Sequence, residues 1–134
     1  VRFQTLSQEG PEAVKAVSQA LWQDLPQDLC VDQWIGIGGT ATTLGAMDLA
    51  MEIYDGRRLQ GHKVSRERIQ DMICDLRAKS PEERRAIPGL QAGRADIITA
   101  GAEIIAAAMD FYDMESLSMS ERDGMEGFEE GLCR

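Results

Sequence analysis

The sequence is poor in histidine and cysteine. Among its 134 residues His62 is the single histidine, which excludes a histidine dyad or a two-histidine metal site within one chain. The three cysteines, Cys30, Cys74 and Cys133, lie far apart and form no CxxC motif. An odd number of separated cysteines indicates reduced thiols rather than disulfides. We therefore expect a cytoplasmic protein without a structural zinc site.

Long apolar runs and a positive net charge are also absent. The longest apolar stretch, from Ile97 to Met109, contains Glu103 and is shorter than the roughly 20 residues of a membrane-spanning helix. The 14 Lys and Arg against 23 Asp and Glu give a formal net charge of −9. Such a surface disfavours nonspecific binding to nucleic acid or anionic membranes. We therefore expect neither a nucleic-acid nor a membrane partner.

The sequence does contain a series of amphipathic segments. Its length of 134 residues suits one domain with one core. Apolar residues at three- and four-residue spacing predict helices over residues 11–21, 40–54 and 65–76, and a last one near 125–132. Ser65 is the expected N-cap of one helix, and Ser80 with Glu83 forms a predicted capping box. A long apolar helix is expected from Arg94 to Tyr112, packed on more than one side.

Two short segments have the character of strands. Trp34 to Ile37 is a short apolar run, and Ser116 to Ser120 alternates apolar residues with serine. Because each strand is followed by a helix, a right-handed crossover and parallel pairing are expected. The predicted class is α/β, mostly helical, with a short parallel strand pair. Two strands are too few for an independently stable sheet, which indicates that part of the fold is missing.

The glycine turn between the first strand and its helix is the feature with the most chemical content. Gly36, Gly38 and Gly39 allow close backbone approach, and Thr40 stands where the helix begins. The free amides at a helix start favour a phosphate or another anion. The turn also matches the dinucleotide pattern G-x-G-x-x-A with Asp55 about twenty residues on, but no strand leads to Asp55. A turn that only packs helix on strand is the other interpretation.

Several segments resemble motifs of the exopolyphosphatase/guanosine pentaphosphate phosphatase (Ppx/GppA) family. Residues 36–49, GIGGTATTLGAMDL, are similar to its "GGTATTLAAMDL" segment. Residues 87–101, which include IPGL, GRADII and AG, resemble its later "LPGL…GRADII…AG" motifs in order and spacing. Val1-Arg2-Phe3 looks like the end of a preceding strand, so the resemblance covers nearly the whole chain. Residues 120–127 depart from "S-D-x-G-L-R-E-G", because Asp123, Gly124 and Met125 interrupt that pattern.

The resemblance implies a two-domain, actin-like (ribonuclease H-like) fold whose cleft binds phosphate chains or nucleotides with Mg²⁺. On this scheme residues 1–134 form a single fragment, the C-terminal portion of the second domain, and the N-terminal catalytic domain is absent. The family's "DIGGGS" loop and catalytic glutamate have no counterpart in the sequence. We therefore expect no catalytic residue and no metal ligand here, and a chain that is inactive alone.

The resemblance also bears on the long helix. Arg94 and Asp96 near its start are possible interdomain or phosphate contacts, although a local ion pair explains Asp96 equally well. Gly101, between two alanines, lets another helix come close. A basic segment around His62, from Arg57 to Arg68, is either a phosphate contact or a solvated face, and the second is the commoner case.

Two functions follow as expectations. The first is a part of a phosphatase that hydrolyses terminal phosphoanhydride bonds of polyphosphate or guanosine pentaphosphate (pppGpp), with Gly36, Gly38, Gly39 and Thr40 lining the phosphate or nucleotide pocket. Its partners would be polyphosphate or a guanine nucleotide and the missing N-terminal domain. The alternative is a noncatalytic module that forms a homodimer through the free edge of the first strand.

Overall fold

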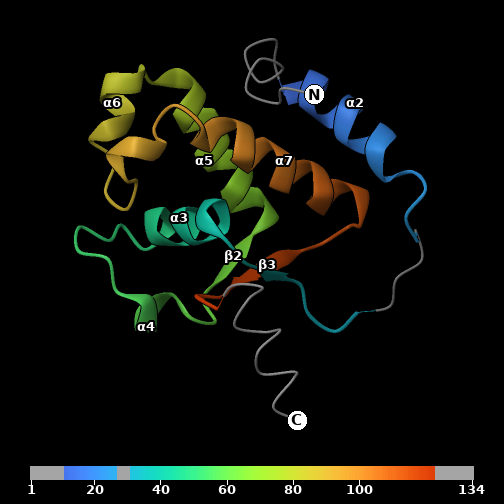
Figure 1. Cartoon of the computed structure of the whole chain (residues 1–134), viewed down its shortest axis with the longest axis horizontal. Helices are drawn as coiled ribbons and strands as arrows, with labels where there is room; N and C mark the ends of the chain where they lie inside the picture. The colour runs from blue at the N-terminus through green and yellow to red at the C-terminus, as the bar shows by residue number, and fades with distance from the viewer. Residues whose placement is uncertain (1–10, 27–30, 123–134) are drawn as a thin grey trace.

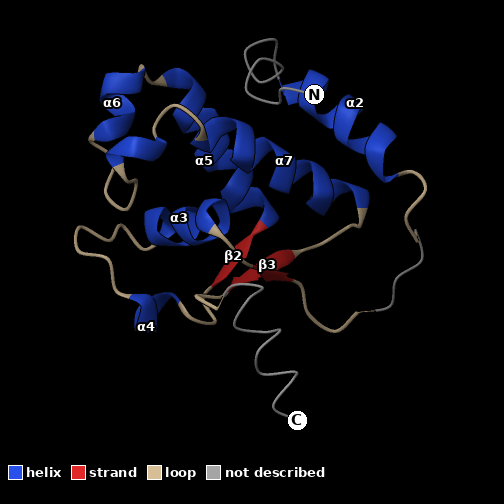
Figure 2. Ribbon diagram, in the orientation of Figure 1, coloured by secondary structure: helices blue, strands red, loops and turns tan. Residues whose placement is uncertain are grey.

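The computed structural model describes residues 11–26 and 31–122. Helix α7 runs through the middle of the molecule and packs against α2, α3 and α5 (Figure 1). The helices gather mainly on one side of a small sheet (Figure 2). The elements in chain order are α2 (Pro11–Trp22), β1 (Ile35–Gly36), α3 (Gly39–Asp48), α4 (Gly56–Leu59), β2 (Lys63–Ser65), α5 (Arg66–Ala78), α6 (Pro81–Arg85), a 3₁₀ helix (Ala92–Arg94), α7 (Ile98–Phe111) and β3 (Ser116–Met119).

The sheet has three strands in the order β1-β3-β2. β1 pairs with β3 in parallel, with Ile35 opposite Ser118, which confirms the predicted parallel pair. β2 pairs with β3 in antiparallel fashion, with Val64 opposite Leu117. We did not predict β2, because Val64 is its single buried residue and three residues show too little alternation to reveal a strand. This third strand makes the sheet mixed rather than a parallel pair alone.

Two helices begin at the serine caps that the sequence predicted. The Ser65 hydroxyl accepts a hydrogen bond from the backbone N–H of Arg68 at 3.1 Å and so caps α5. The Ser80 hydroxyl accepts from the N–H of Glu83, and the Glu83 carboxylate accepts from the N–H of Ser80 at 2.7 Å. The predicted capping box at α6 is therefore confirmed.

Two predicted helices are shorter than expected. The helix predicted over 40–54 ends at Asp48, because Ala50 adopts a left-handed φ of 49°. There the N–H of Met51 bonds back to the carbonyl of Ala46 at 3.0 Å, which closes the helix end. The helix predicted from Arg94 begins only at Ile98. Before it, bonds over three residues, such as Arg94 N–H to the Gln91 carbonyl, form a tighter 3₁₀ turn.

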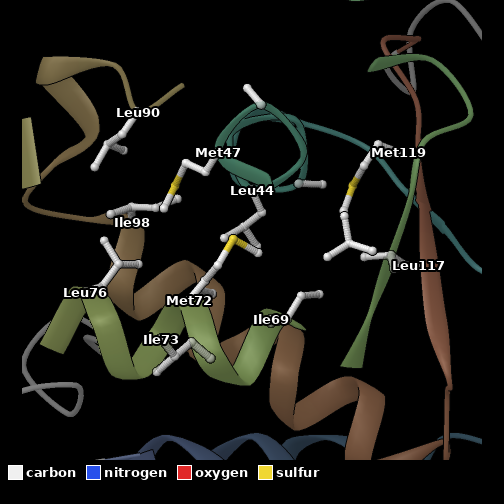
Figure 3. Close-up of a cluster of buried hydrophobic side chains, with 14 of the residues drawn as sticks. Leu44, Met47, Ile69, Met72, Ile73, Leu76, Leu90, Ile98, Leu117 and Met119 are labelled. Carbon is white, nitrogen blue, oxygen red and sulfur yellow. The ribbon is translucent and has the colours of Figure 1, made fainter. Parts of the chain in front are cut away.

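The core lies where α3, α5, α7 and β3 meet. Leu44, Ile69, Leu76, Ile98 and Met109 each lie at 0–1% exposure. Figure 3 shows that side chains from α3 and α5 face one another across this layer, with those of β3 beside them. Met47, Met51, Met72 and Met109 are buried and fill gaps in this core with their flexible side chains. α7, apolar and in contact with three helices, packs on more than one side as predicted.

Some expectations concern segments outside the described residues. These are the strand at Val1-Arg2-Phe3, the helix near 125–132 and most of the divergent segment Glu121 to Met125. Within the described parts of the chain, no helix is long and apolar enough to cross a bilayer.

Candidate functional site

The glycine turn lies between the end of β1 and the start of α3. Gly38 has φ 89° and ψ 176°, a conformation essentially restricted to glycine, and no side chain caps the helix at this point. The amides of Gly39, Thr40 and Ala41 in the first turn of α3 have no partner within the helix, and the first such bond runs from the N–H of Thr42 to the carbonyl of Gly38. The Thr42 hydroxyl donates to the carbonyl of Gly38 at 3.0 Å, so it serves the turn and not a ligand. Gly38 is exposed, and Gly39 and Thr40 are half-buried. The turn therefore offers backbone donors at the surface.

Gly36 has a packing role in the same turn. It is buried, and a Cβ at this position would lie 2.9 Å from Leu117 Cδ2 and 3.0 Å from Ala41 Cβ. The carbonyl of Gly36 accepts a hydrogen bond from the N–H of Ser120 at 2.9 Å. Gly36 thus lets α3 and β3 approach the strand, which is the interpretation of the turn as a packing element.

Arg94 lies directly over the turn. A Cβ at Gly39 would collide with Cζ and both terminal nitrogens of the Arg94 guanidinium, so the two residues are in close contact. Arg94 is half-buried, and its Nε donates to Gln91 Oε1 at 3.2 Å. Within residues 11–26 and 31–122 no carboxylate forms an ion pair with Arg94. A guanidinium beside the positive end of a helix is a like-charge arrangement, which an anion between them stabilises.

The other two predicted residues of the long helix have different positions. A Cβ at Gly101 would lie 2.7 Å from both Cγ2 and Oγ1 of Thr40, so the backbone of α7 touches the first turn of α3. Gly101 thus allows the close helix approach that the sequence predicted. Asp96 is exposed and lies 3.8 Å from Arg85 Nη2, in a weak surface ion pair. The structure therefore brings Arg94 and Gly101 to the glycine turn and leaves Asp96 in a separate contact.

The end of β3 lies at the same edge of the sheet as the glycine turn, because β1 and β3 are parallel. The carboxyl ends of parallel strands are the usual place for ligands in α/β folds. Here Gln60 holds the chain after β3, since its Oε1 accepts from the N–H of Glu121 at 2.8 Å and its amide lies 3.4 Å from the hydroxyl of Ser120. Gln60 belongs to no motif, so its role was not predicted; the motif around Ser120 was the one sequence signal at this edge.

Three basic side chains of the segment from Arg57 to Arg68 make contacts within the fold. Arg66 pairs with Asp113 at 3.2 Å. Arg68 Nε donates to Asp48 Oδ1 at 2.7 Å, and His62 Nε2 lies 2.6 Å from Asp48 Oδ2. Burial raises the pKa of Asp48, but hydrogen bonds from His62 and Arg68 and their charges lower it, and the net pKa lies below the ordinary value. These contacts join the end of α3 to α5 and to the residue before β2, so His62 and Arg68 are held by Asp48 within the fold.

The described residues bring together no group of three or more His, Cys, Asp or Glu side chains that could hold a metal ion. We therefore assign no metal ligand to this part of the chain.

Comparison with known proteins places these features in a family. Residues 3–132 match the model of the Ppx/GppA phosphatase family. Exopolyphosphatase 2 of Mycobacterium tuberculosis is 29% identical over 98 residues, which cover 70% of this chain and 31% of that protein. The bifunctional 3-dehydroquinate synthase/phosphatase of Fusobacterium nucleatum is 29% identical over 93 residues, 69% of this chain and 14% of that protein.

The fold comparison agrees with the sequence comparison. The crystal structure of the Aquifex aeolicus Ppx/GppA family member superimposes with a TM-score of 0.76 at 27% identity, covering 91% of this chain and 41% of that one. The expected actin-like class is thereby confirmed. The chain spans less than half the length of these relatives. It belongs to the Ppx/GppA phosphatase family and corresponds to a C-terminal part of such a protein.

Proposed function

We propose that this chain is part of a phosphatase that hydrolyses terminal phosphoanhydride bonds of polyphosphate or pppGpp, and that the glycine turn with Arg94 forms one wall of its phosphate or nucleotide pocket. The observation that carries the proposal is the guanidinium of Arg94 against Gly39, at a helix start with free amides. Family membership supports the phosphatase role. The mycobacterial relative is an exopolyphosphatase by name, which favours a polyphosphate substrate.

The proposal assigns binding, not bond cleavage, to this chain. Phosphoryl transfer needs a group that positions the attacking water and a metal ion that neutralises the phosphates. We assign neither to the described residues, so another domain would supply the base and the ligands of Mg²⁺. This chain would hold and orient the anion through Gly38, Gly39, Thr40 and Arg94, and alone it would release no phosphate. The relatives' greater length supports a further domain.

Binding is tested by thermal unfolding of the chain with tripolyphosphate or GTP, at constant ionic strength. A ligand that binds the folded state raises its unfolding temperature. Arg94→Gln removes the guanidinium, and Arg85→Gln is the matched control, because Arg85 pairs weakly with the exposed Asp96 away from the turn. We expect stabilisation in the wild type and in Arg85→Gln, and about tenfold weaker binding in Arg94→Gln. Equal stabilisation of all three proteins contradicts the proposed pocket.

Catalysis is tested on the longer protein that contains this chain. Phosphate release is measured from polyphosphate and from pppGpp with Mg²⁺ present. Release from at least one of them is the expected result. If neither substrate yields phosphate, the phosphatase proposal fails even where the binding test succeeds.

A second candidate function is self-association through β1. One edge of this strand has no partner among the described residues, and Ile35 and Ile37 are 59% and 51% exposed beside it. Open edges pair readily with other strands. In a longer protein further strands would cover this edge, and in the isolated chain a second copy would do so. Light scattering of the isolated chain tests this, with Ile37→Lys as the variant expected to convert a dimer to a monomer. A monomeric wild type at high concentration excludes the homodimer.

A further inference from the structure

A glutamine holds the arginine that covers the glycine turn. The Nε of Arg94 donates to Oε1 of Gln91 at 3.2 Å, and the backbone N–H of Arg94 donates to the Gln91 carbonyl at 2.9 Å. Arg94 is thus attached to Gln91 at two points, once through the main chain and once through the side chain. The contact through Nε is the one hydrogen bond that the Arg94 side chain forms with the described parts of the chain.

Gln91 is itself fixed relative to α3. The chain between α6 and α7 passes beside α3 (Figure 1), and the residues directly before Gln91 are Gly89 and Leu90. Leu90 is buried in the core, and a Cβ at Gly89 would collide with the backbone of Ala46 and Met47 in α3. Because these residues pack in the core and on α3, Gln91 is an anchor whose position relative to the glycine turn is set by the fold.

The hydrogen bond decides which end of the guanidinium faces the glycine turn. With Nε turned to Gln91, both terminal nitrogens of Arg94 lie closer than Cζ to the place of a Gly39 Cβ. A guanidinium offers paired N–H donors along its Nε side and across its two terminal nitrogens. Since Gln91 uses the Nε side, the terminal pair remains for two oxygens of a phosphate, beside the free amides of α3.

The partner of Arg94 is neutral, which matters for an anion site. A carboxylate in the place of the Gln91 amide would hold Nε as well, but its charge would oppose that of the guanidinium and weaken the attraction for a phosphate. Gln91 fixes the side chain and leaves the positive charge whole. The acid nearest along the chain, Asp96, pairs with Arg85 instead.

We propose that Gln91 is a positioning residue of the anion site, whose amide oxygen orients Arg94 toward the glycine turn without neutralising it. The inference rests on the proposed function, because it takes Arg94 as a ligand of the phosphate chain. Gln91 acts on the anion through Arg94 and not by direct contact.

The test measures the affinity of the intact chain for tripolyphosphate by calorimetric titration, at neutral pH and constant ionic strength. Gln91→Met removes the amide and keeps the length of the side chain. Gln91→Glu keeps an acceptor for Nε and adds a negative charge. Gln70→Glu is the matched control, because Gln70 is exposed on α5, which carries neither the glycine turn nor Arg94. Arg94→Gln is measured alone and combined with Gln91→Met.

We expect Gln91→Met to bind tripolyphosphate about threefold more weakly than the wild type, which is the size of one neutral hydrogen bond. Gln91→Glu should bind about tenfold more weakly, although it holds Arg94 more tightly, because its charge offsets that of the guanidinium. A merely structural role predicts no loss in Gln91→Glu, which keeps the hydrogen bond. Gln70→Glu should bind as the wild type does. Adding Gln91→Met to Arg94→Gln should cause no further loss.

The outcomes separate this inference from the proposed function. If the wild type does not bind tripolyphosphate, or if Arg94→Gln binds it equally well, the proposed pocket fails and the role of Gln91 fails with it. If Arg94→Gln weakens binding but both Gln91 variants bind as the wild type does, the pocket stands and the role of Gln91 is excluded. A loss from Gln91→Met that persists beside Arg94→Gln, or equal losses in Gln70→Glu and Gln91→Glu, also overturns the proposal. Unfolding temperatures without the anion should be unchanged, because Gln91 is exposed, so folded proteins are compared.

Discussion

The guanidinium of Arg94 occupies the space that a side chain on Gly39 would need. These residues lie 55 positions apart, and each was a candidate on separate grounds: Gly39 as part of a glycine turn, Arg94 as part of a motif at the start of a long helix. Their contact joins the two motifs in one place. It also explains why position 39 is a glycine, since any Cβ there would displace the guanidinium of Arg94.

Gly39→Ala tests this contact. Position 39 is the first residue of α3 and has no left-handed φ, so alanine adds no backbone strain. We expect an unfolding free energy within about 1 kcal/mol of the wild type, because alanine favours helix while the guanidinium must move. Stabilisation by tripolyphosphate should fall as in Arg94→Gln. The measurement is the unfolding temperature with and without the anion, and an undiminished anion effect would show that the position of Arg94 does not matter.

Gly101→Ala tests the approach of α3 to α7. The new methyl group would lie 2.7 Å from Thr40 Cγ2 and Oγ1, and both helices are held in the core. We expect a loss of about 1–3 kcal/mol in unfolding free energy. The double variant with Thr40→Ala should recover part of this loss, since the two colliding atoms are gone. Chemical denaturation of the four proteins in a double-mutant cycle measures the coupling, and strictly additive effects would contradict the contact.

Gly89 and Gly61 form a matched pair for a third test. Both have positive φ, 90° and 79°, so alanine strains the backbone at either position. A Cβ at Gly89 would in addition collide with the backbone of Ala46 and Met47, whereas nothing lies within 4 Å of one at Gly61. We expect Gly61→Ala to lose about 1–2 kcal/mol and Gly89→Ala to lose at least about 1 kcal/mol more. Equal losses in urea unfolding would mean that the Pro88-Gly89 turn does not pack on α3 as described.

The contacts of Asp48 predict a pH dependence. Its folded-state pKa lies below the ordinary value of 3.8, so the unfolded state binds the proton more tightly. The contribution of Asp48 to stability is therefore fully present above pH 3.8 and is lost as the pH falls through the folded-state pKa. Asp48→Asn should be less stable than the wild type at pH 6, and the difference should shrink below pH 3.8. Asp96→Asn, at an exposed carboxylate, is the control that should show little difference at either pH. If Asp48→Asn lowers the unfolding free energy by the same amount at pH 6 and below pH 3.8, the lowered pKa of Asp48 is contradicted.

Much of the fold could be predicted because its signals are local. Ser65 and Ser80 cap α5 and α6 through bonds to N–H groups three residues away, which the sequence alone reveals. The parallel pairing of β1 and β3 follows from strand order and crossover handedness. Strand β2 could not be predicted in the same way. Its three residues become a strand only because β3 lies beside them.

The residues of the glycine-turn site also divide into those that the local sequence reveals and those that it does not. Gly38 requires a conformation that glycine alone adopts readily, and its place between an apolar strand and a helix identified the turn. Neither the contact of Arg94 with Gly39 nor the role of Gln60 at the end of β3 has a local cause. Asp96, two residues after Arg94, was an equal candidate in the sequence but pairs with Arg85 outside the turn. Distance along the chain does not tell which side chain a fold brings to a ligand.

By itself the sequence determined the family, the helix caps and the anion-favouring turn, because these depend on residue identity and on hydrogen bonds between near neighbours. The tertiary structure alone decided that Arg94 covers Gly39, that Gly101 contacts Thr40, and that Glu103 of α7 is buried in an ion pair with Arg77 of α5. Such contacts depend on how α7 packs against α3 on one side and against α2 and α5 on others. Packing between distant segments is set by the shape of the whole core, which no local pattern encodes.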